Sequence, residues 1–220
     1  MIQNTISVLI RFYPQFLQGL SITLFLSFLT VFFGTVLGSL LALCKMAKFK
    51  PLSFLVTAYI EVIRGTPLLL QLYFFVFMLP ILIGVTLSTF TSILIALVLN
   101  SSAYVAEIIR AGIQAVDKGQ TEAARSLGLN TTQTMIRIIL PQAVKNILPT
   151  LVNEFIMVIK ETSLASVFFL GDLMTQVNVL RGALFLSIEP LMIAGAIYFI
   201  VTFSLSKLVA AYERRLATSD

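Results

Sequence analysis

The sequence has no histidine and no tryptophan, and it has one cysteine, Cys44. A single cysteine cannot form a disulfide within the chain. The usual zinc sites, and the Cys-His and Ser-His catalytic arrangements, need histidine or further cysteines. These sites are therefore excluded, and Cys44 is interpreted as a small apolar residue at a helix end.

No lysine in the chain follows a glycine, so the Gly-Lys-Ser/Thr phosphate loop of ATPases is absent. Any ATP, with its Mg, must be bound and hydrolysed by another polypeptide. No cofactor is expected in this chain, and its predicted role is non-catalytic.

Charge is also scarce, at 11% of residues, whereas 58% are hydrophobic. This composition is far more apolar than that of a soluble domain and indicates a membrane protein. Because a spanning helix needs ~20 apolar residues, the chain holds five or six spans and no separate soluble domain. We therefore expect residues 1–220 to form one transmembrane domain.

The predicted fold is all-α, a polytopic membrane protein of five transmembrane helices with a cytoplasmic helical loop between the third and fourth. The five apolar runs are residues 17–44, 52–79, 87–109, 150–170 and 190–212. Pro51, Pro80, Pro149 and Pro190 are predicted to lie at span ends, where proline is tolerated. The uncharged run 12–44 is too long for a signal-peptide core, so it is interpreted as a retained first span.

Lysine and arginine predict the orientation. Arg11 and Arg181 lie on one side, against eleven on the other: Lys45, Lys48, Lys50, Arg110, Lys118, Arg125, Arg137, Lys145, Lys207, Arg214 and Arg215. The positive-inside rule then puts the N-terminus outside and the C-terminus in the cytoplasm. The net charge of +5 is interpreted as this topology signal and not as nucleic-acid binding.

Residues 112–141 form the one long polar segment. Asp117 with Gln120, and Asn130 with Gln133, have the spacing of capping boxes, and Gly128 suits the left-handed turn that ends a helix. The segment is predicted to be a helix, a glycine turn and a second helix, protruding into the cytoplasm.

The same segment resembles the loop by which membrane subunits of ATP-binding cassette importers engage their ATPases. The matching positions are Glu122, Ala123, Ala124, Gly128, Ile138, Leu140 and Pro141. Residues 112–120 resemble the version found in permeases for polar amino acids. An ordinary surface helical hairpin is the alternative, but helix propensity explains the composition of the segment and not its spacing.

Ionisable residues at membrane depth form two predicted clusters, and such residues need a partner or a water-filled cavity. In the first, Glu61 and Arg64 are one helical turn apart and can pair with each other. Thr66 and Pro67 follow, and Pro67 has no N–H for the carbonyl of Ile63. A broken helix is therefore expected at residues 65–67, lining protein or a cavity.

The second cluster lies in the fourth span, where Glu154 with Glu161, and Asn153 with Lys160, share helix faces. The two clusters and an uncharged group of the third span make up the predicted substrate pathway. Its residues are Glu61, Arg64, Thr66, Asn100, Asn153, Glu154, Lys160, Glu161 and Ser163. The alternative is structural, with ion pairs and small residues that fix helix packing.

Residues 63–71, 153–156 and 160–164 also resemble signatures of the polar amino acid permeases. The resemblance implies a five-span core, two permease subunits, two ATPases and an extracytoplasmic solute-binding protein in the cell membrane. A homodimer is the simplest assembly, and a heterodimer with a sister permease is the alternative.

The predicted function is therefore ATP-driven import of polar, and specifically basic, amino acids. The three acids Glu61, Glu154 and Glu161 outnumber the bases Arg64 and Lys160, which favours a cationic side chain. That side chain is predicted to meet Glu61 or Glu154. The substrate carboxylate could meet Arg64, Lys160 or the N-terminus of the broken helix. The alternatives are a glutamine- or glutamate-type substrate in the same machinery, an ion-driven transporter or channel, and an intramembrane enzyme. The enzyme is disfavoured by the lack of histidine and of an Asp pair in the spans.

Overall fold

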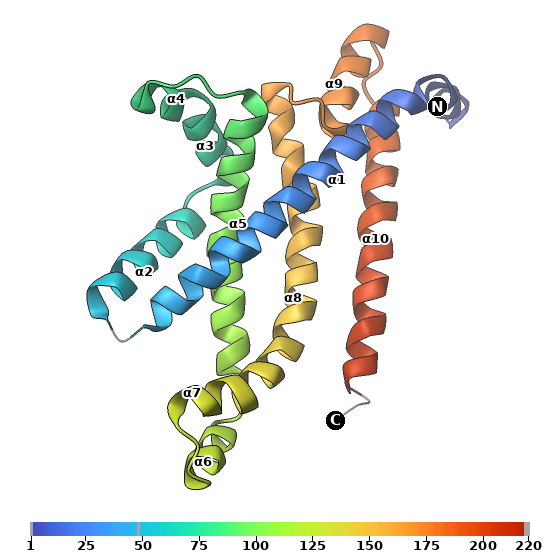
Figure 1. The fold of residues 1–220 in the computed structure, drawn as a ribbon. Coiled ribbons are helices and arrows are strands. Elements are labelled where there is room, and N and C mark those ends of the chain that lie inside the picture. Colours follow the sequence, from blue (N-terminus) through green and yellow to red (C-terminus); the bar gives the residue numbers. More distant parts are fainter. Residues whose placement is uncertain (1, 48, 218–220) are drawn as a thin grey trace.

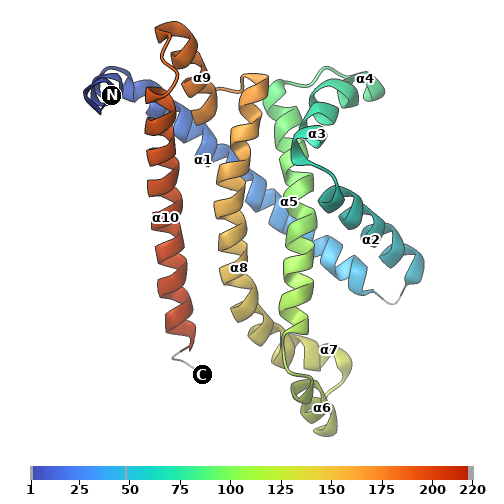
Figure 2. The ribbon, with the colours of Figure 1, turned by 180° about the vertical axis from the view of Figure 1, so that it is seen from behind.

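The computed structural model describes residues 2–47 and 49–217, and all regular structure within these ranges is helical. The helix α1 (Ile2–Met46) runs obliquely across the molecule, and α5 (Thr89–Gln114), α8 (Leu140–Glu161) and α10 (Glu189–Ala217) stand beside one another (Figures 1 and 2). The predicted all-α fold is confirmed.

Four helical segments are long and apolar enough to cross a membrane: Gln3–Met46, Thr89–Gln114, Thr131–Phe168 and Glu189–Ala211. The fifth span is a bent pair, Lys50–Gly65 and Leu68–Ile83, whose axes differ by 105°. It comprises α2 (Lys50–Gly65), α3 (Leu68–Tyr73), a π-helical turn (Phe74–Met78) and α4 (Leu79–Ile83). The five predicted spans are thus present when the bent pair counts as one.

Several predicted boundaries are wrong. The first helix begins at Ile2, with a non-helical residue at Phe12 and Pro14 inside it. The fourth span begins earlier than residue 150, because α8 starts at Leu140 and carries Pro149 in its interior. Membrane helices tolerate an interior proline, so this residue does not mark an end. Pro80 lies in the first turn of α4, and the helical turns continue past it.

The predicted break at residues 171–189 contains another helix, α9 (Leu173–Leu184), which follows a 3₁₀ segment (Thr162–Phe168). Asp172 caps α9 by accepting hydrogen bonds from the Met174 N–H (3.0 Å) and the Thr175 hydroxyl. The Leu173 N–H donates to Thr23 Oγ1 of α1 at 3.1 Å. Asp172 is fully buried, and this burial raises the pKa of its carboxyl.

Three apolar clusters hold the helices together. One joins α1, α9 and α10 around Phe16, and the second joins α1, α3 and α5 around Leu72. The third joins α1, α2 and α5 around Ile60 and includes Cys44, which lies near the end of α1 as expected. Because α1 takes part in all three, it braces both ends of the bundle.

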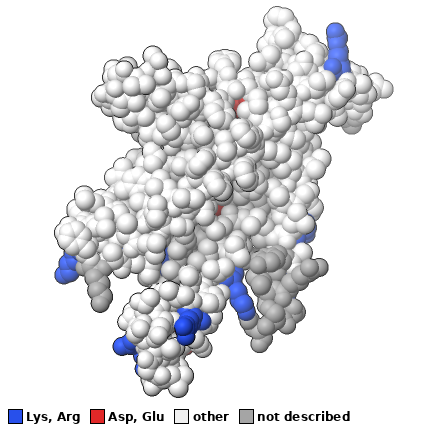
Figure 3. Space-filling model, viewed as in Figure 1, with Lys and Arg blue, Asp and Glu red and all other residues white. Residues whose placement is uncertain are grey.

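Basic residues gather at the end of the molecule that carries α6 (Lys118–Ser126), α7 (Thr131–Thr134) and the C-terminus (Figure 3). The N-terminus, α4 and α9 lie at the opposite end (Figure 1). Of the basic residues that predict the orientation, Lys48 and the side chain of Arg215 lie outside the described residues. The distribution has the polarity on which the predicted orientation depends.

Candidate functional site

The second span breaks where the sequence predicts. Helix α2 ends at Gly65, and Thr66 and Pro67 are extended, with ψ of 144° and 133°. The carbonyl of Ile63, which Pro67 cannot serve, accepts a hydrogen bond from Gln71 Nε2 at 2.7 Å. The same amide nitrogen donates to the carbonyl (3.2 Å) and hydroxyl (2.9 Å) of Thr66. Gln71 therefore stabilises the break from within its own segment.

Gln71 also connects the break to α5. Its Oε1 accepts a hydrogen bond from Asn100 Nδ2 at 3.0 Å, and both side chains are buried. Two predicted pathway residues, Thr66 and Asn100, are thus brought together through a third residue that the predicted set omits. The available signal was a lone glutamine, four residues after Pro67, in an otherwise apolar run.

The adjacent polar residues of α5 contact different neighbours because successive residues point about 100° apart around a helix. Asn100 faces α3, whereas Ser101 Oγ donates to Glu154 Oε1 of α8 at 3.0 Å. Ser102 Oγ lies 3.0 Å from the hydroxyl of Tyr59 in α2. Helix α5 therefore makes polar contacts with α2, α3 and α8, and Glu154 lies on the side of α5 that faces α8.

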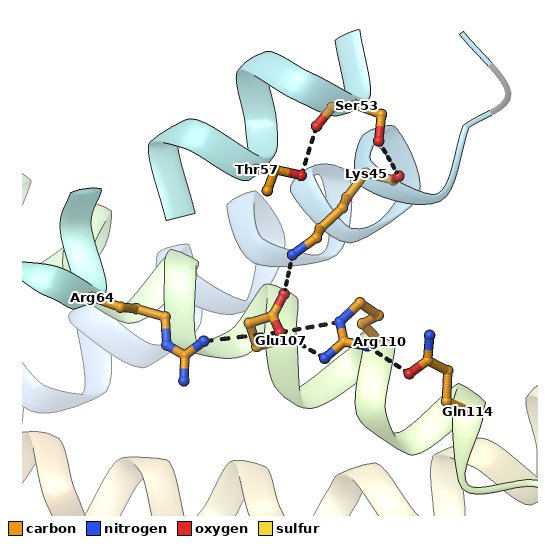
Figure 4. Close-up of polar contacts among 7 residues, drawn as sticks. All are labelled: Lys45, Ser53, Thr57, Arg64, Glu107, Arg110 and Gln114. Carbon is orange, nitrogen blue, oxygen red and sulfur yellow. Dashed lines mark hydrogen bonds and ion pairs between the residues drawn. The ribbon is translucent and has the colours of Figure 1, made fainter. Parts of the chain in front are cut away.

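A basic cluster lies closer to the α6 end of α5 and is centred on Glu107 (Figure 4). Lys45 Nζ of α1 is 2.6 Å from Glu107 Oε1, and Arg110 donates to Oε2 through Nε (3.0 Å) and Nη2 (2.8 Å). Arg64 Nη1 of α2 is 3.8 Å from Oε2, and its guanidinium lies over the Tyr104 ring at 5.3 Å from the centroid. Three cations thus share one carboxylate.

Glu61 and Arg64 therefore do not form the ion pair that their spacing allows. Arg64 turns toward α5, whereas Glu61 is exposed on α2 and takes part in none of the ion pairs of residues 2–47 and 49–217. Glu107 was missed because it falls in the apolar run 87–109. Its spacing of three from Arg110 was the signal that could have found it.

Of the remaining predicted residues, Asn153 directly precedes Glu154, Lys160 and Glu161 end α8, and Ser163 lies in the 3₁₀ segment that follows. Asn153 and Lys160 are exposed, and Glu161 is half-buried. Ser163 Oγ donates to the carbonyl of Lys160 at 2.6 Å. Glu161 follows Glu154 by seven positions, which is roughly 10 Å along a helix. The structure therefore places the predicted residues beside the polar face of α5, in the basic cluster and at the end of α8, whereas Glu61 and Asn153 are exposed outside these groups.

The polar segment 112–141 folds as the predicted helix, turn and helix. Asn130 and Gln133 form a complete capping box, with N···O distances of 2.9 and 3.0 Å. Asp117 caps α6 through the N–H of Gly119 at 2.8 Å. The capping box predicted for Asp117 and Gln120 is wrong. The Gln120 side chain instead accepts a hydrogen bond at Oε1 from Gln142 Nε2, at 3.4 Å.

Gly128 ends α6 in the left-handed conformation, with φ of +85°. The Gly128 N–H donates to the carbonyl of Arg125 (3.0 Å) and the Leu129 N–H to that of Ala124 (3.2 Å). These two bonds form a Schellman motif. Among the other residues that resemble the coupling loop, Glu122, Ala123, Leu140 and Pro141 are exposed and Ala124 is buried.

Residues 34–218 match the family described as binding-protein-dependent transport system inner membrane component. The arginine transport system permease protein ArtQ of Bacillus subtilis (strain 168) is 44% identical over 207 residues, covering 94% of each chain. The putative glutamine transport system permease protein GlnP of Rickettsia bellii (strain RML369-C) is 43% identical over 214 residues, covering 96% of this chain and 98% of its own.

A chain in the crystal structure of an amino acid ABC transporter with histidines has the same fold, with a TM-score of 0.91. It is 48% identical in sequence, and the match covers 94% of this chain and 96% of that chain.

Proposed function

Since this chain belongs to the binding-protein-dependent transport system inner membrane components, the permease subunits of ATP-binding cassette importers, we propose that it carries basic amino acids into the cell. Arginine is the first candidate, followed by lysine, with histidine as a further one. Amino acids as a class are common to the relatives' names. The proposal of a basic side chain goes beyond this shared class.

Permeases of this family work with a separate ATPase subunit, a second permease and a solute-binding protein. ATP and Mg belong to the ATPase. Family membership also excludes the ion-driven transporter or channel as the main alternative.

The observation that carries the basic substrate is the surroundings of Glu154. This carboxylate lies between α8 and α5, and the hydroxyl of Ser101 is its hydrogen-bond partner. No cation of the described residues lies within 4.0 Å of it, since the ion pairs there all involve Glu107. A carboxylate at membrane depth favours a positive partner. A guanidinium or ammonium side chain of the substrate would supply that charge.

The proposed role of residues 112–141 is to couple the spans to the ATPase. Glu122 and the tip of the loop are exposed, and Leu127 beside Gly128 is 84% exposed. At the root of the loop, Gly112 of α5 packs so closely on α8 that a Cβ there would lie 2.3 Å from Ile147 Cγ1. A displacement of the loop would therefore be passed directly to α5 and α8, the two helices that hold Ser101 and Glu154.

Glutamine is the second candidate, favoured by the similarity to a permease with glutamine in its name. The test uses proteoliposomes that contain the permease, its ATPase and its solute-binding protein. Arginine, lysine, histidine and glutamine are added one at a time, and ATP hydrolysis is measured. The proposal requires arginine or lysine to stimulate hydrolysis at lower concentration than glutamine. A preference for glutamine would replace the basic substrate and leave the importer function unchanged.

A further inference from the structure

The basic cluster has a deficit of negative charge. Lys45, Arg64 and Arg110 surround Glu107, so two positive charges are not matched within the cluster. Both oxygens of Glu107 already accept short hydrogen bonds, Oε1 from Lys45 and Oε2 from Arg110. The distance of 3.8 Å to Arg64 is too long for a further one. Glu107 therefore does not satisfy the positive charge and N–H donors of Arg64, which suit a further anion.

Arg64 is positioned to receive one. Its guanidinium lies over the ring of Tyr104, a contact that holds the flat face and leaves the N–H edges available. Figure 4 shows one nitrogen directed to Glu107 and the others directed away from it. Arginine in this arrangement suits the two oxygens of a carboxylate or phosphate.

A cavity of about 470 Å³ adjoins this side chain, lined among others by Arg64, Tyr104, Glu107, Arg110, Asn146 and Thr150. Its volume lies within the range of about 300–1,000 Å³ found for small-molecule sites. Glu107 is the one acid among its lining residues, and it is already occupied. The cavity therefore favours an anionic group of small size.

The cavity also lies in line with Glu154. Asn146 and Thr150 precede Glu154 by two turns and one turn of α8, which places them roughly 12 and 6 Å along the helix. An amino acid with its cationic side chain at Glu154 would thus extend its carboxylate toward Arg64. The other two carboxylate partners that the sequence offers are less suitable. Lys160 lies on the far side of Glu154, and α3, which follows the break, has six residues and a correspondingly small dipole.

We propose that this cavity binds the α-carboxylate of the transported amino acid through Arg64, with the substrate's carboxylate directed toward the α6 end. The assignment rests on the proposed function, because it requires an amino acid as the solute. Glu107 acts as a positioning residue, since it holds Arg110 and Lys45 and leaves the donors of Arg64 for the ligand.

The test measures binding of radiolabelled L-arginine to the permease–ATPase complex in phosphatidylcholine nanodiscs. The solute-binding protein is left out, so that its own recognition of the carboxylate does not contribute. Agmatine, which is arginine without its carboxylate, is the competitor. Arg64→Gln should weaken arginine binding about 10- to 100-fold and change agmatine binding by no more than about twofold.

Lys45→Gln is the matched control, because it removes the same charge from the same carboxylate while Lys45 does not line the cavity. It should leave the ratio of arginine to agmatine affinity unchanged. Equal losses for arginine and agmatine in Arg64→Gln, or the same change of ratio in Lys45→Gln, would overturn the assignment.

Two further experiments distinguish a failure of the basic-substrate proposal from a failure of the carboxylate site. If glutamine binds and arginine does not, the basic substrate is wrong, and the comparison is repeated with glutamine and its decarboxylated form, 4-aminobutanamide. A loss confined to glutamine in Arg64→Gln still supports the carboxylate site. In nanodiscs of phosphatidylglycerol, weaker arginine binding by the wild type but not by Arg64→Gln would assign the cavity to a lipid phosphate. That result, or no binding of either amino acid by the wild type, overturns the proposal.

Discussion

Gln71 and Glu154 are polar side chains within the helical bundle, and they differ in how many of their hydrogen-bonding groups have partners. The amide of Gln71 donates to three acceptors on Ile63 and Thr66 and accepts from Asn100. A carboxylate has about four acceptor sites, and Glu154 has a hydroxyl partner for one of its two oxygens, Ser101. Gln71 is thus satisfied by its own fold, whereas Glu154 retains capacity for a ligand.

The residue-scale prediction concerns Glu154→Gln. This change keeps the shape of the side chain and removes its charge, so a cationic substrate loses its counter-charge. The half-saturating concentration for arginine uptake should rise about 100-fold, while glutamine uptake changes by less than about threefold. Uptake is measured in proteoliposomes with the ATPase and the solute-binding protein.

Glu61→Gln is the control, since Glu61 was the other acid predicted to meet the substrate and is exposed on α2. It should leave the ratio of arginine to glutamine uptake as in the wild type. If the two variants behave alike, Glu154 has no special role in selecting a basic side chain.

At the scale of elements, the turn between α6 and α7 depends on backbone geometry rather than on packing. A side chain at Gly128 would meet nothing within 4 Å, but its φ of +85° disfavours any residue with a Cβ. The exposed end of α6 is therefore shaped by one residue, and the proposed contact of the loop with an ATPase depends on that shape.

Gly128→Val should strain this turn by about 1–2 kcal/mol. The expected result is loss of substrate-stimulated ATP hydrolysis, or loss of the ATPase on co-purification, with the permease still present in the membrane. Gly128→Asn should retain most of the wild-type activity, because asparagine tolerates the left-handed conformation. Full coupling in the valine variant would contradict the proposed role of the loop.

The crossing of α1 and α5 depends on close contact. A Cβ on Gly34 would lie 3.0 Å from Ser101 Cβ, and one on Gly38 would lie 2.7 Å from Val105 Cβ and 2.8 Å from the carbonyl oxygen of Ser102. Glycines four residues apart allow membrane helices to approach in this way. The contact keeps α1 against the polar face of α5.

Gly38→Ala should therefore lower the thermal unfolding temperature of the purified permease, because overpacking costs about 1–3 kcal/mol. Val105→Ala in the same chain should restore part of the loss. Gly195→Ala is the matched control, a glycine of α10 with nothing within 4 Å of the added Cβ. A Gly38→Ala variant as stable as Gly195→Ala would show that α1 and α5 have room for an added Cβ at their crossing.

At the scale of the whole molecule, the basic residues and the α6–α7 loop lie at one end of the bundle, and α4 and α9 lie at the other (Figures 1 and 3). We propose that the end with the loop faces the cytoplasm, by the positive-inside rule. The N-terminus would then lie outside.

Cysteine labelling in a Cys44→Ala background tests this orientation. A cysteine in place of Val85, which is 52% exposed beyond α4, should react with an impermeant reagent added to intact cells. A cysteine in place of the exposed Ser126 in α6 should react after the membrane is opened. The opposite pattern would invert the proposed topology and remove the loop from any cytoplasmic ATPase.

The apolar composition of the sequence determined the membrane class. Local chemistry determined the helix–turn–helix of residues 112–141 and the break at residues 65–67. Each depends on groups within about four positions of one another: Pro67 lacks the N–H that the carbonyl of Ile63 needs, and Gly128 has no Cβ to strain a left-handed turn. Such features form wherever the segment lies in the fold, so the sequence was sufficient to predict them.

Tertiary structure alone decided which side chains meet. Arg64 has Glu61 one turn away, yet it faces Glu107, which lies 43 positions later in the chain. Asn100 and Ser101 are neighbours in the sequence, yet they contact α3 and α8, respectively. Helix packing sets these partners through contacts such as that between Gly38 and Val105. Residue spacing alone does not determine these partners, because they depend on the rotation and crossing of whole helices.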